Sequence, residues 1–263
     1  MMTLEEIRRK IEEAEMILVG LGEEFQHPAN VREMPEYEKG KTLLQEAGLF
    51  WLLPMWDDYC EHMIKSDTAE TLKKLADMLN DKNYFVVSVA MNHFIVEVPW
   101  KEGRLVMPCG SSTKLQCAGG CGEKPIPLSE RHKRLLEEIM CDLYHGKLEP
   151  EKINDLGNCE KCNASLILNN IYAEHYNEDG YMEQWNLYTK WLQGTLNRNV
   201  LILELGVGMK FPSVIRFPFE KIAYFNQKAQ FYRINEKLYQ MTEELCGKGC
   251  GLSQNAIDCL RNL

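Results

Sequence analysis

The sequence predicts an α/β protein with a parallel sheet and a small cysteine-rich module. Two features predict the sheet. Continuous apolar runs of strand length alternate with helix-like stretches, and several of these runs end in glycine or a polar residue. A third feature predicts the module, because six of the ten cysteines gather, with many glycines, between residues 104 and 181.

The composition limits the class of protein. The chain has 263 residues, of which 45% are hydrophobic and 26% are charged, as in ordinary globular proteins and unlike a disordered chain or a coiled-coil rod. The formal net charge of −9 argues against non-specific nucleic-acid binding. The start of the chain lacks the apolar region of a secretion signal, and Pro54 breaks the apolar run Leu49–Trp56. We therefore expect a cytoplasmic protein without membrane contact, whose cysteines bind metal or stay free.

The first half of the chain is predicted to form a helix, a strand, a second helix and a second strand. Leu4, Ile7 and Ile11 follow helical spacing, and the apolar run at 16–19 ends in the glycine turn 20–22. Asp67 and Glu70 then mark the start of a second helix, which ends at 80–83. The apolar run Tyr84–Ala90 follows and predicts a buried parallel strand.

The second half begins with the module and then returns to the sheet. A helix is predicted at Ser129–His145, inside the cysteine-rich segment. A further helix after Gly180 leads to the predicted strands Val200–Leu205 and Phe231–Ile234. We therefore expect a nucleotide-binding domain from residues 1–103 and 182–263, with residues 104–181 as a small zinc-binding module that contains a helical insertion.

Two cysteine pairs have the spacing of metal ligands. Cys117 and Cys121 are separated by three residues, and Cys159 and Cys162 by two. Two such pairs complete a tetrahedral site of four thiolates, which favours Zn²⁺ and has a structural rather than a catalytic role. The alternative is that these are scattered free cysteines.

The glycine turn after the first predicted strand departs from a dinucleotide-binding fingerprint. Gly20 and Gly22 are present, but Phe25 stands where the third glycine would be. Glu23 and Glu24 place two carboxylates beside it, and each would oppose a diphosphate by about 1–4 kcal/mol at a surface-like dielectric. The alternative is a turn that only joins the strand to the next segment.

Three segments carry a resemblance to a known family. They are Leu115–Cys117 with Cys121, the segment Cys159–Cys162, and Leu203–Met209 continuing through Pro212 to Phe219. Taken in order, these features resemble the sirtuins, which combine a Rossmann-like parallel-sheet domain with a small zinc-ribbon module. The likeness is greatest to the microbial branch encoded beside macrodomain proteins, which is associated with protein ADP-ribosylation.

The resemblance implies ligands and a function. Sirtuins use NAD to remove acyl groups from lysine or to transfer ADP-ribose, so it implies structural zinc, NAD or ADP-ribose, and a protein substrate or partner. We expect a sirtuin-like protein of the NAD-dependent ADP-ribosyltransferase and deacylase class, with altered or lost catalysis. The alternative is a non-catalytic sirtuin-like module that binds a nucleotide or a protein. The cofactor-binding residues it implies are Gly20, Gly22, Gly206, Val207, Gly208 and Asn235.

The departures from the family fall on the catalytic positions. Ala90 and Asn92 stand where the family has an asparagine and an aspartate, and each lost polar contact costs about 10²–10³ in rate. Where deacylases carry their histidine base, this chain has Cys109. The catalytic residues are therefore unknown, and the candidates are Asn92, His93 and Cys109.

A group of acidic residues on a predicted helix allows two interpretations. Asp57, Asp58 and Glu61 lie close together in the sequence, beside Trp56 and Tyr59. They could form an acid/base pair, but such a run is typical of a helix surface that faces solvent. We therefore expect a solvated face.

Overall fold

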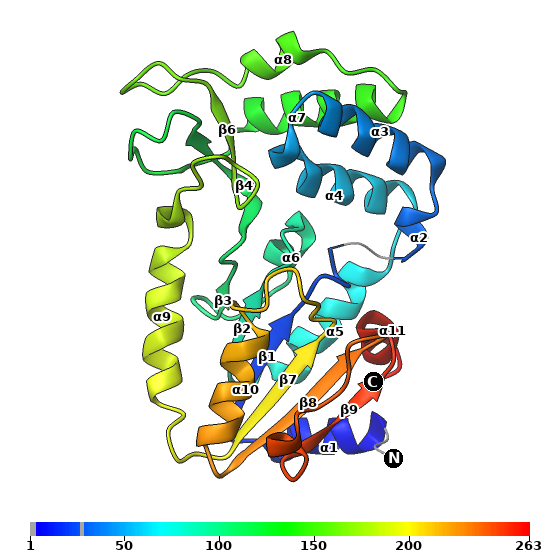
Figure 1. Ribbon diagram of the computed structural model, residues 1–263, viewed down its shortest axis with the longest axis vertical. Helices are drawn as coiled ribbons and strands as arrows, with labels where there is room; N and C mark the ends of the chain where they lie inside the picture. The colour runs from blue at the N-terminus through cyan, green and yellow to red at the C-terminus, as the bar shows by residue number, and fades with distance from the viewer. Residues whose placement is uncertain (1–3, 27–28) are drawn as a thin grey trace.

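A computed structural model describes residues 4–26 and 29–263, and it confirms the predicted α/β class. Six parallel strands form the main sheet in the order β3-β2-β1-β7-β8-β9 (Figure 1). The four strands predicted from apolar runs are its centre, and two short strands are its edges. The bounds are β1 Met16–Leu21, β2 Asn83–Ser88, β3 Leu105–Val106, β7 Val200–Leu205, β8 Ala229–Asn235 and β9 Gly249–Ser253.

Helices cover both faces of this sheet, which explains why its central strands are mostly apolar. In β1, Ile17 and Val19 belong to the core on one face, whereas Met16 and Leu18 belong to the core on the other. The first core includes residues of α1, α5 and α11, and the second includes residues of α9 and α10. The bounds are α1 Leu4–Glu13, α5 Thr68–Leu79, α9 Met182–Gln193, α10 Arg216–Phe225 and α11 Ala256–Arg261.

The cysteine-rich module lies beyond the carboxyl ends of the strands (Figure 1). It contains a three-stranded antiparallel sheet, β5-β4-β6, and the helix predicted between the cysteine pairs. Ser129 caps that helix by accepting a hydrogen bond from the His132 amide. The bounds are β4 Gly110–Cys117, β5 Ile126–Pro127, β6 Leu166–Asn170, α7 Glu130–Tyr144 and α8 Pro150–Asn154.

The helical segment 29–63, which lies between β1 and β2, shares a hydrophobic core with this module. Trp56 and Tyr37 lie in one buried cluster with Leu115 and Met140 of the module. The segment 29–63 therefore packs with residues 104–181, although it belongs to the other unit in the division expected from the sequence, which remains a prediction. The bounds are α2 Ala29–Arg32, α3 Pro35–Glu46, α4 Leu53–Met63 and α6 His93–Glu97, with short 3-10 helices at Phe50–Leu52, Glu178–Gly180 and Glu243–Leu245.

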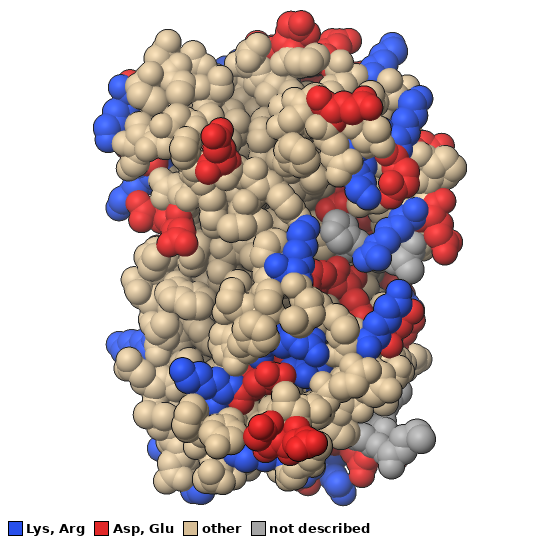
Figure 2. Space-filling model, in the orientation of Figure 1, with Lys and Arg blue, Asp and Glu red and all other residues tan. Residues whose placement is uncertain are grey.

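The face of the molecule drawn in Figure 2 carries charges of both signs. On the face drawn in Figure 2, Lys and Arg side chains are interspersed with Asp and Glu rather than gathered in one basic area. Within the part of the chain that the structure describes, none of the helices has the length and hydropathy needed to span a bilayer.

Candidate functional site

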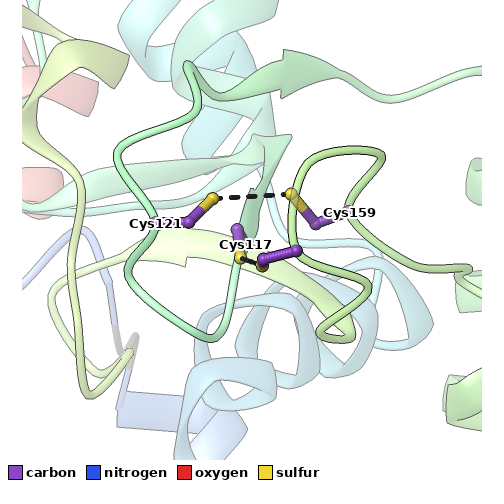
Figure 3. A group of neighbouring side chains, drawn as sticks. Cys117, Cys121 and Cys159 are labelled. Carbon is purple, nitrogen blue, oxygen red and sulfur yellow. Dashed lines mark hydrogen bonds between the residues drawn. The ribbon is translucent and has the colours of Figure 1, made fainter.

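The four predicted metal ligands converge. Cys117 ends β4, Cys121 follows in the next turn, and Cys159 and Cys162 come from the turn before β6. Their sulfur atoms all lie within 4.8 Å of one another. The Sγ atoms of Cys117 and Cys162 are 3.3 Å apart, and those of Cys121 and Cys159 are 3.5 Å apart. Figure 3 shows the sulfur atoms facing each other from the two turns.

This geometry fits a zinc ion. Tetrahedral Zn²⁺ with Zn–S bonds of about 2.3 Å requires sulfur atoms about 3.8 Å apart, close to the observed separations. Four thiolates leave no ligand position for water, so the ion would stabilise the fold rather than take part in a reaction. The described residues thus form the closed four-cysteine site predicted from the sequence.

A second candidate site lies where the strands end. The turn after β1 crosses the turn after β7, and the Gly22 amide donates to Leu205. A side chain at position 22 is excluded, because its Cβ would lie 2.2 Å from the Gly206 carbonyl oxygen. Gly206 itself has a φ of 64°, in the left-handed region that favours glycine. Both turns therefore depend on glycine, and their crossing brings together Gly22, Gly206, Val207 and Gly208, whereas Gly20 lies in β1 against Ile215 and Phe219.

Asn235, at the end of β8, joins the neighbouring turn to this crossing. Its Oδ1 accepts hydrogen bonds from the amides of Lys237 and Leu238, at 2.9 and 2.7 Å. Its Nδ2 donates to the Val207 carbonyl at 3.2 Å. The side chain is 5% exposed, so it fixes the shape of the edge from within.

A buried network of charged side chains contacts the turns that follow β7 and β8. Arg233 of β8 lies beside Glu204 of β7 in the strand register, and its Nε is 2.6 Å from the Glu204 carboxylate. Arg233 also contacts Glu220 of α10 at 2.6 Å and donates to the Gln240 carbonyl. Arg216 donates to the Val207 carbonyl on the turn after β7 and to the Leu238 carbonyl on the turn after β8. The sequence interpretation missed this network, although a glutamate inside an apolar strand was a signal for it.

The carboxylates of the first turn bind backbone amides on other turns. Glu23 accepts from Gly208 at 2.6 Å and from Lys210 at 3.1 Å. Glu24 accepts from Glu236 at 2.9 Å and from Ala256 at 2.7 Å. Burial raises the pKa of Glu24, and the two amide bonds oppose that rise. The edge therefore contains amide donors suited to anions, and the chain's own glutamates use them.

The same turn reaches the acidic residues of α4 through Gln26, a residue that the sequence interpretation did not single out. Its Nε2 donates to Asp57 at 2.8 Å, and its Oε1 accepts from the Met91 amide at 2.5 Å. The expectation of a solvated acidic face is wrong: Asp57 is 3% exposed and Glu61 is 5% exposed. Since α4 packs among the helices α2, α3, α6 and α7 and the strand β4, local spacing could not reveal this burial.

This acidic cluster contains unused hydrogen-bond acceptors. Among the described residues, Asp58 Oδ1, Glu61 Oε1 and Asn92 Oδ1 are buried without a donor. Asn92 Nδ2 lies 3.5 Å from Glu61, and Asp58 Oδ2 accepts from the His93 amide at 2.7 Å. Burial raises the pKa of Asp58 well above its usual range and raises that of Glu61 to about 7.

The raised pKa of Glu61 predicts a pH-dependent stability. Between its ordinary value of 4.5 and about 7, the folded protein holds a proton that the unfolded chain has released. The free energy of unfolding therefore falls as pH rises through this window, by about 3 kcal/mol at ~1.4 kcal/mol per pKa unit. Urea denaturation at pH 5 and pH 8 measures the difference.

The control for this prediction is Glu61→Gln, which is uncharged at every pH. It is expected to lose the part of the pH dependence that comes from Glu61 and to keep the part that comes from Asp58 and other groups. Equal pH dependence in the wild type and in Glu61→Gln would contradict the assignment to Glu61.

The three candidate catalytic residues lie in different environments. Asn92 is fully buried beside the acidic cluster. The His93 imidazole is 45% exposed and lies 3.3 Å from Glu97. Cys109 is 2% exposed, and burial, together with the charge of Glu23, raises the pKa of its thiol to about 12. A buried, protonated thiol is a poor nucleophile.

Comparison with known proteins gives distant relatives. No protein-family model matches the chain. A protein ADP-ribosyltransferase of Staphylococcus aureus is 18% identical over 260 residues, which cover 92% of this chain and 80% of that protein. A probable bifunctional ADP-ribose hydrolase/ADP-ribosyltransferase of Fusarium oxysporum f. sp. cubense is 30% identical over 127 residues, 47% of this chain and 20% of that protein.

Solved structures match over nearly the whole chain. Sir2Tm bound to a propionylated peptide is similar with a TM-score of 0.58 and 11% identity, covering 99% of this chain and 97% of that one. A complex described as Sir2-p53 peptide-NAD+ has a TM-score of 0.53 with the same identity and coverage. The resemblance predicted from the sequence is thus confirmed in the architecture: this chain has the fold of the Sir2 sirtuins.

Proposed function

We propose that this protein binds an ADP-ribosyl nucleotide, NAD or ADP-ribose, at the carboxyl edge of its parallel sheet. The observation that carries the proposal is the set of backbone amides there, because those of Gly208, Lys210, Glu236 and Ala256 all bind carboxylates in the structure. Amides directed at a carboxylate are equally suited to a phosphate. The names of the curated relatives and the NAD-bound structural neighbour support the same ligand class.

The residues that would bind this nucleotide are those predicted from the sequence. Gly22 and Gly206 let the two turns approach closely, Gly20 makes room for Ile215 and Phe219 behind them, and Gly208 contributes an amide. Val207 and Asn235 form the rim between the ends of β7 and β8. NAD, when bound, would supply the activated ADP-ribosyl group, and these residues would bind and orient it.

Within this class of NAD-dependent ADP-ribosyltransferases and deacylases, we propose that catalysis is altered or lost. The Asn92 side chain is fully buried beside Glu61 and Asp58 rather than on an open surface. Cys109, at the position of the deacylase histidine, is buried with a raised pKa and lacks the character of a general base. A non-catalytic nucleotide-binding module is therefore the second candidate, and the peptides bound to the sirtuin neighbours make a protein partner reasonable for either.

The test combines binding with catalysis. Zinc-loaded protein is heated with increasing ADP-ribose, NAD or adenosine, and nicotinamide release from NAD is measured with and without an acylated peptide. We expect the melting temperature to rise with ADP-ribose concentration, because a ligand of the folded state stabilises it. We expect nicotinamide release to stay at the buffer rate.

The outcomes separate the candidates. A melting temperature that does not respond to any of the nucleotides contradicts the proposed function. Peptide-dependent release of nicotinamide would show that the protein is an active enzyme and would contradict the loss of catalysis. Peptide-independent release would identify an NAD-cleaving activity with altered chemistry.

A further inference from the structure

The turn after β1 contains a carboxylate in the place of an external anion. Both oxygens of Glu23 are used, with Oε2 on the Gly208 amide at 2.6 Å and Oε1 on the Lys210 amide at 3.1 Å. Amides of residues i and i+2 that point into one concavity form an anion-binding nest, and here one carboxylate fills it. Hydrogen bonds to an ionised acceptor are about twice as strong as neutral ones.

The rest of the turn keeps Glu23 in this position. The Gly22 amide donates to Leu205, the Glu24 amide donates to Gly206, and the Gln26 amide donates back to the Glu23 carbonyl. The Glu24 carboxylate accepts two further hydrogen bonds, from the backbone amides of Glu236 and Ala256. The turn that carries Glu23 is therefore held in place by hydrogen bonds that do not involve the Glu23 carboxylate.

A phosphate and this carboxylate exclude each other. They would use the same two amides, and two like charges about 4 Å apart repel by about 1–4 kcal/mol between water and a surface-like dielectric. The Lys210 side chain contacts Tyr172 of the module, and this contact leaves the competition for the Lys210 backbone amide unchanged. An anionic ligand must therefore displace Glu23, whereas a ligand without phosphate need not.

We propose that Glu23 is the residue that determines affinity for phosphate-bearing ligands at this edge: its carboxylate occupies the amides of Gly208 and Lys210, and a nucleotide phosphate binds there only by displacing it. This inference rests on the proposed function and deepens it, since it assigns the phosphate position and its competitor. Glu23→Gln removes the charge but keeps one acceptor oxygen, and Glu23→Ala removes both acceptors.

The experiment measures dissociation constants by calorimetry for ADP-ribose, adenosine and inorganic pyrophosphate. In both Glu23 variants we expect ADP-ribose and pyrophosphate to bind about tenfold to a hundredfold tighter than in the wild type, as loss of a competing charged hydrogen bond implies. Adenosine is expected to bind equally to all. Glu174→Gln is the matched control, because it removes an exposed glutamate charge outside the proposed nucleotide site, and it should leave all three constants unchanged within about twofold.

Each outcome has one meaning. Equal ADP-ribose affinity in the wild type and the Glu23 variants, or an equal gain in Glu174→Gln, overturns the role of Glu23 and leaves nucleotide binding intact. Tighter pyrophosphate binding in the Glu23 variants without ADP-ribose binding in any protein supports the role of Glu23 and overturns the proposed nucleotide. No binding of any ligand to any variant that melts cooperatively overturns both.

Discussion

Cys162→Ser is expected to lower the melting temperature by about 8–16 °C. The reason is loss of one of four zinc ligands, since a lost structural metal costs more than about 4 kcal/mol and each kcal/mol corresponds to about 2–4 °C in a protein of this size. Cys162 is exposed, so the change removes little packing. Scanning calorimetry with zinc analysis of the same samples measures both effects.

Cys246→Ser is the matched control for this prediction. Cys246 is also an exposed free cysteine, but it lies outside the four-sulfur cluster. It should melt within about 2 °C of the wild type and keep one zinc per chain. If both serine variants behave alike, or if the wild type contains no stoichiometric zinc, the metal does not support the module.

Arg233→Met is expected to destabilise the protein by about 3–5 kcal/mol, because it leaves Glu204 buried without its main partner. Arg233 is 1% exposed and Glu204 is fully buried, and their two contacts are 2.6 and 3.1 Å long. Arg216, at 3.5 Å, is the remaining cation near Glu204. Guanidinium denaturation of the purified variant measures the loss.

The double variant Glu204→Leu with Arg233→Met is the control for this ion pair. Replacing a buried pair by apolar residues of similar size is often neutral, so we expect it to recover most of the lost stability. Equal stability of the single and double variants would contradict the account. Because Arg233 also binds the Gln240 carbonyl, the double variant should still show weaker nucleotide binding than the wild type.

Continuous apolar runs were sufficient to predict the centre of the sheet. The strands β1, β2, β7 and β8 are buried on both faces, so most of their positions select apolar residues and the pattern is visible in the sequence. The edge strand Gly249–Ser253 carries two glycines, and Leu105–Val106 has only two residues. Neither segment has enough apolar residues to be recognised as a strand from the sequence, because each becomes a strand only by pairing with its neighbour in the sheet.

The metal site could be predicted because its ligands are pairs that are close in the sequence. The carboxyl edge could be predicted only in outline, because its contacts join distant residues: Glu23 binds Gly208, and Glu24 binds Ala256. The sequence indicated that these carboxylates oppose a diphosphate, but their contacts with backbone amides depend on how the turns cross. The burial of Glu61 likewise depends on helices that pack from elsewhere.

A crystal structure of the zinc-loaded protein with ADP-ribose tests the central claim most directly, namely that the carboxyl edge of the sheet binds the nucleotide. We expect a phosphate within hydrogen-bond distance of the Gly208 and Lys210 amides, with the Glu23 side chain turned away. The contradicting result is Glu23 still on those amides and the ligand elsewhere. One such place is the cavity of about 730 Å³ at the opposite edge, lined by residues that include Asn83, Lys190 and Arg198.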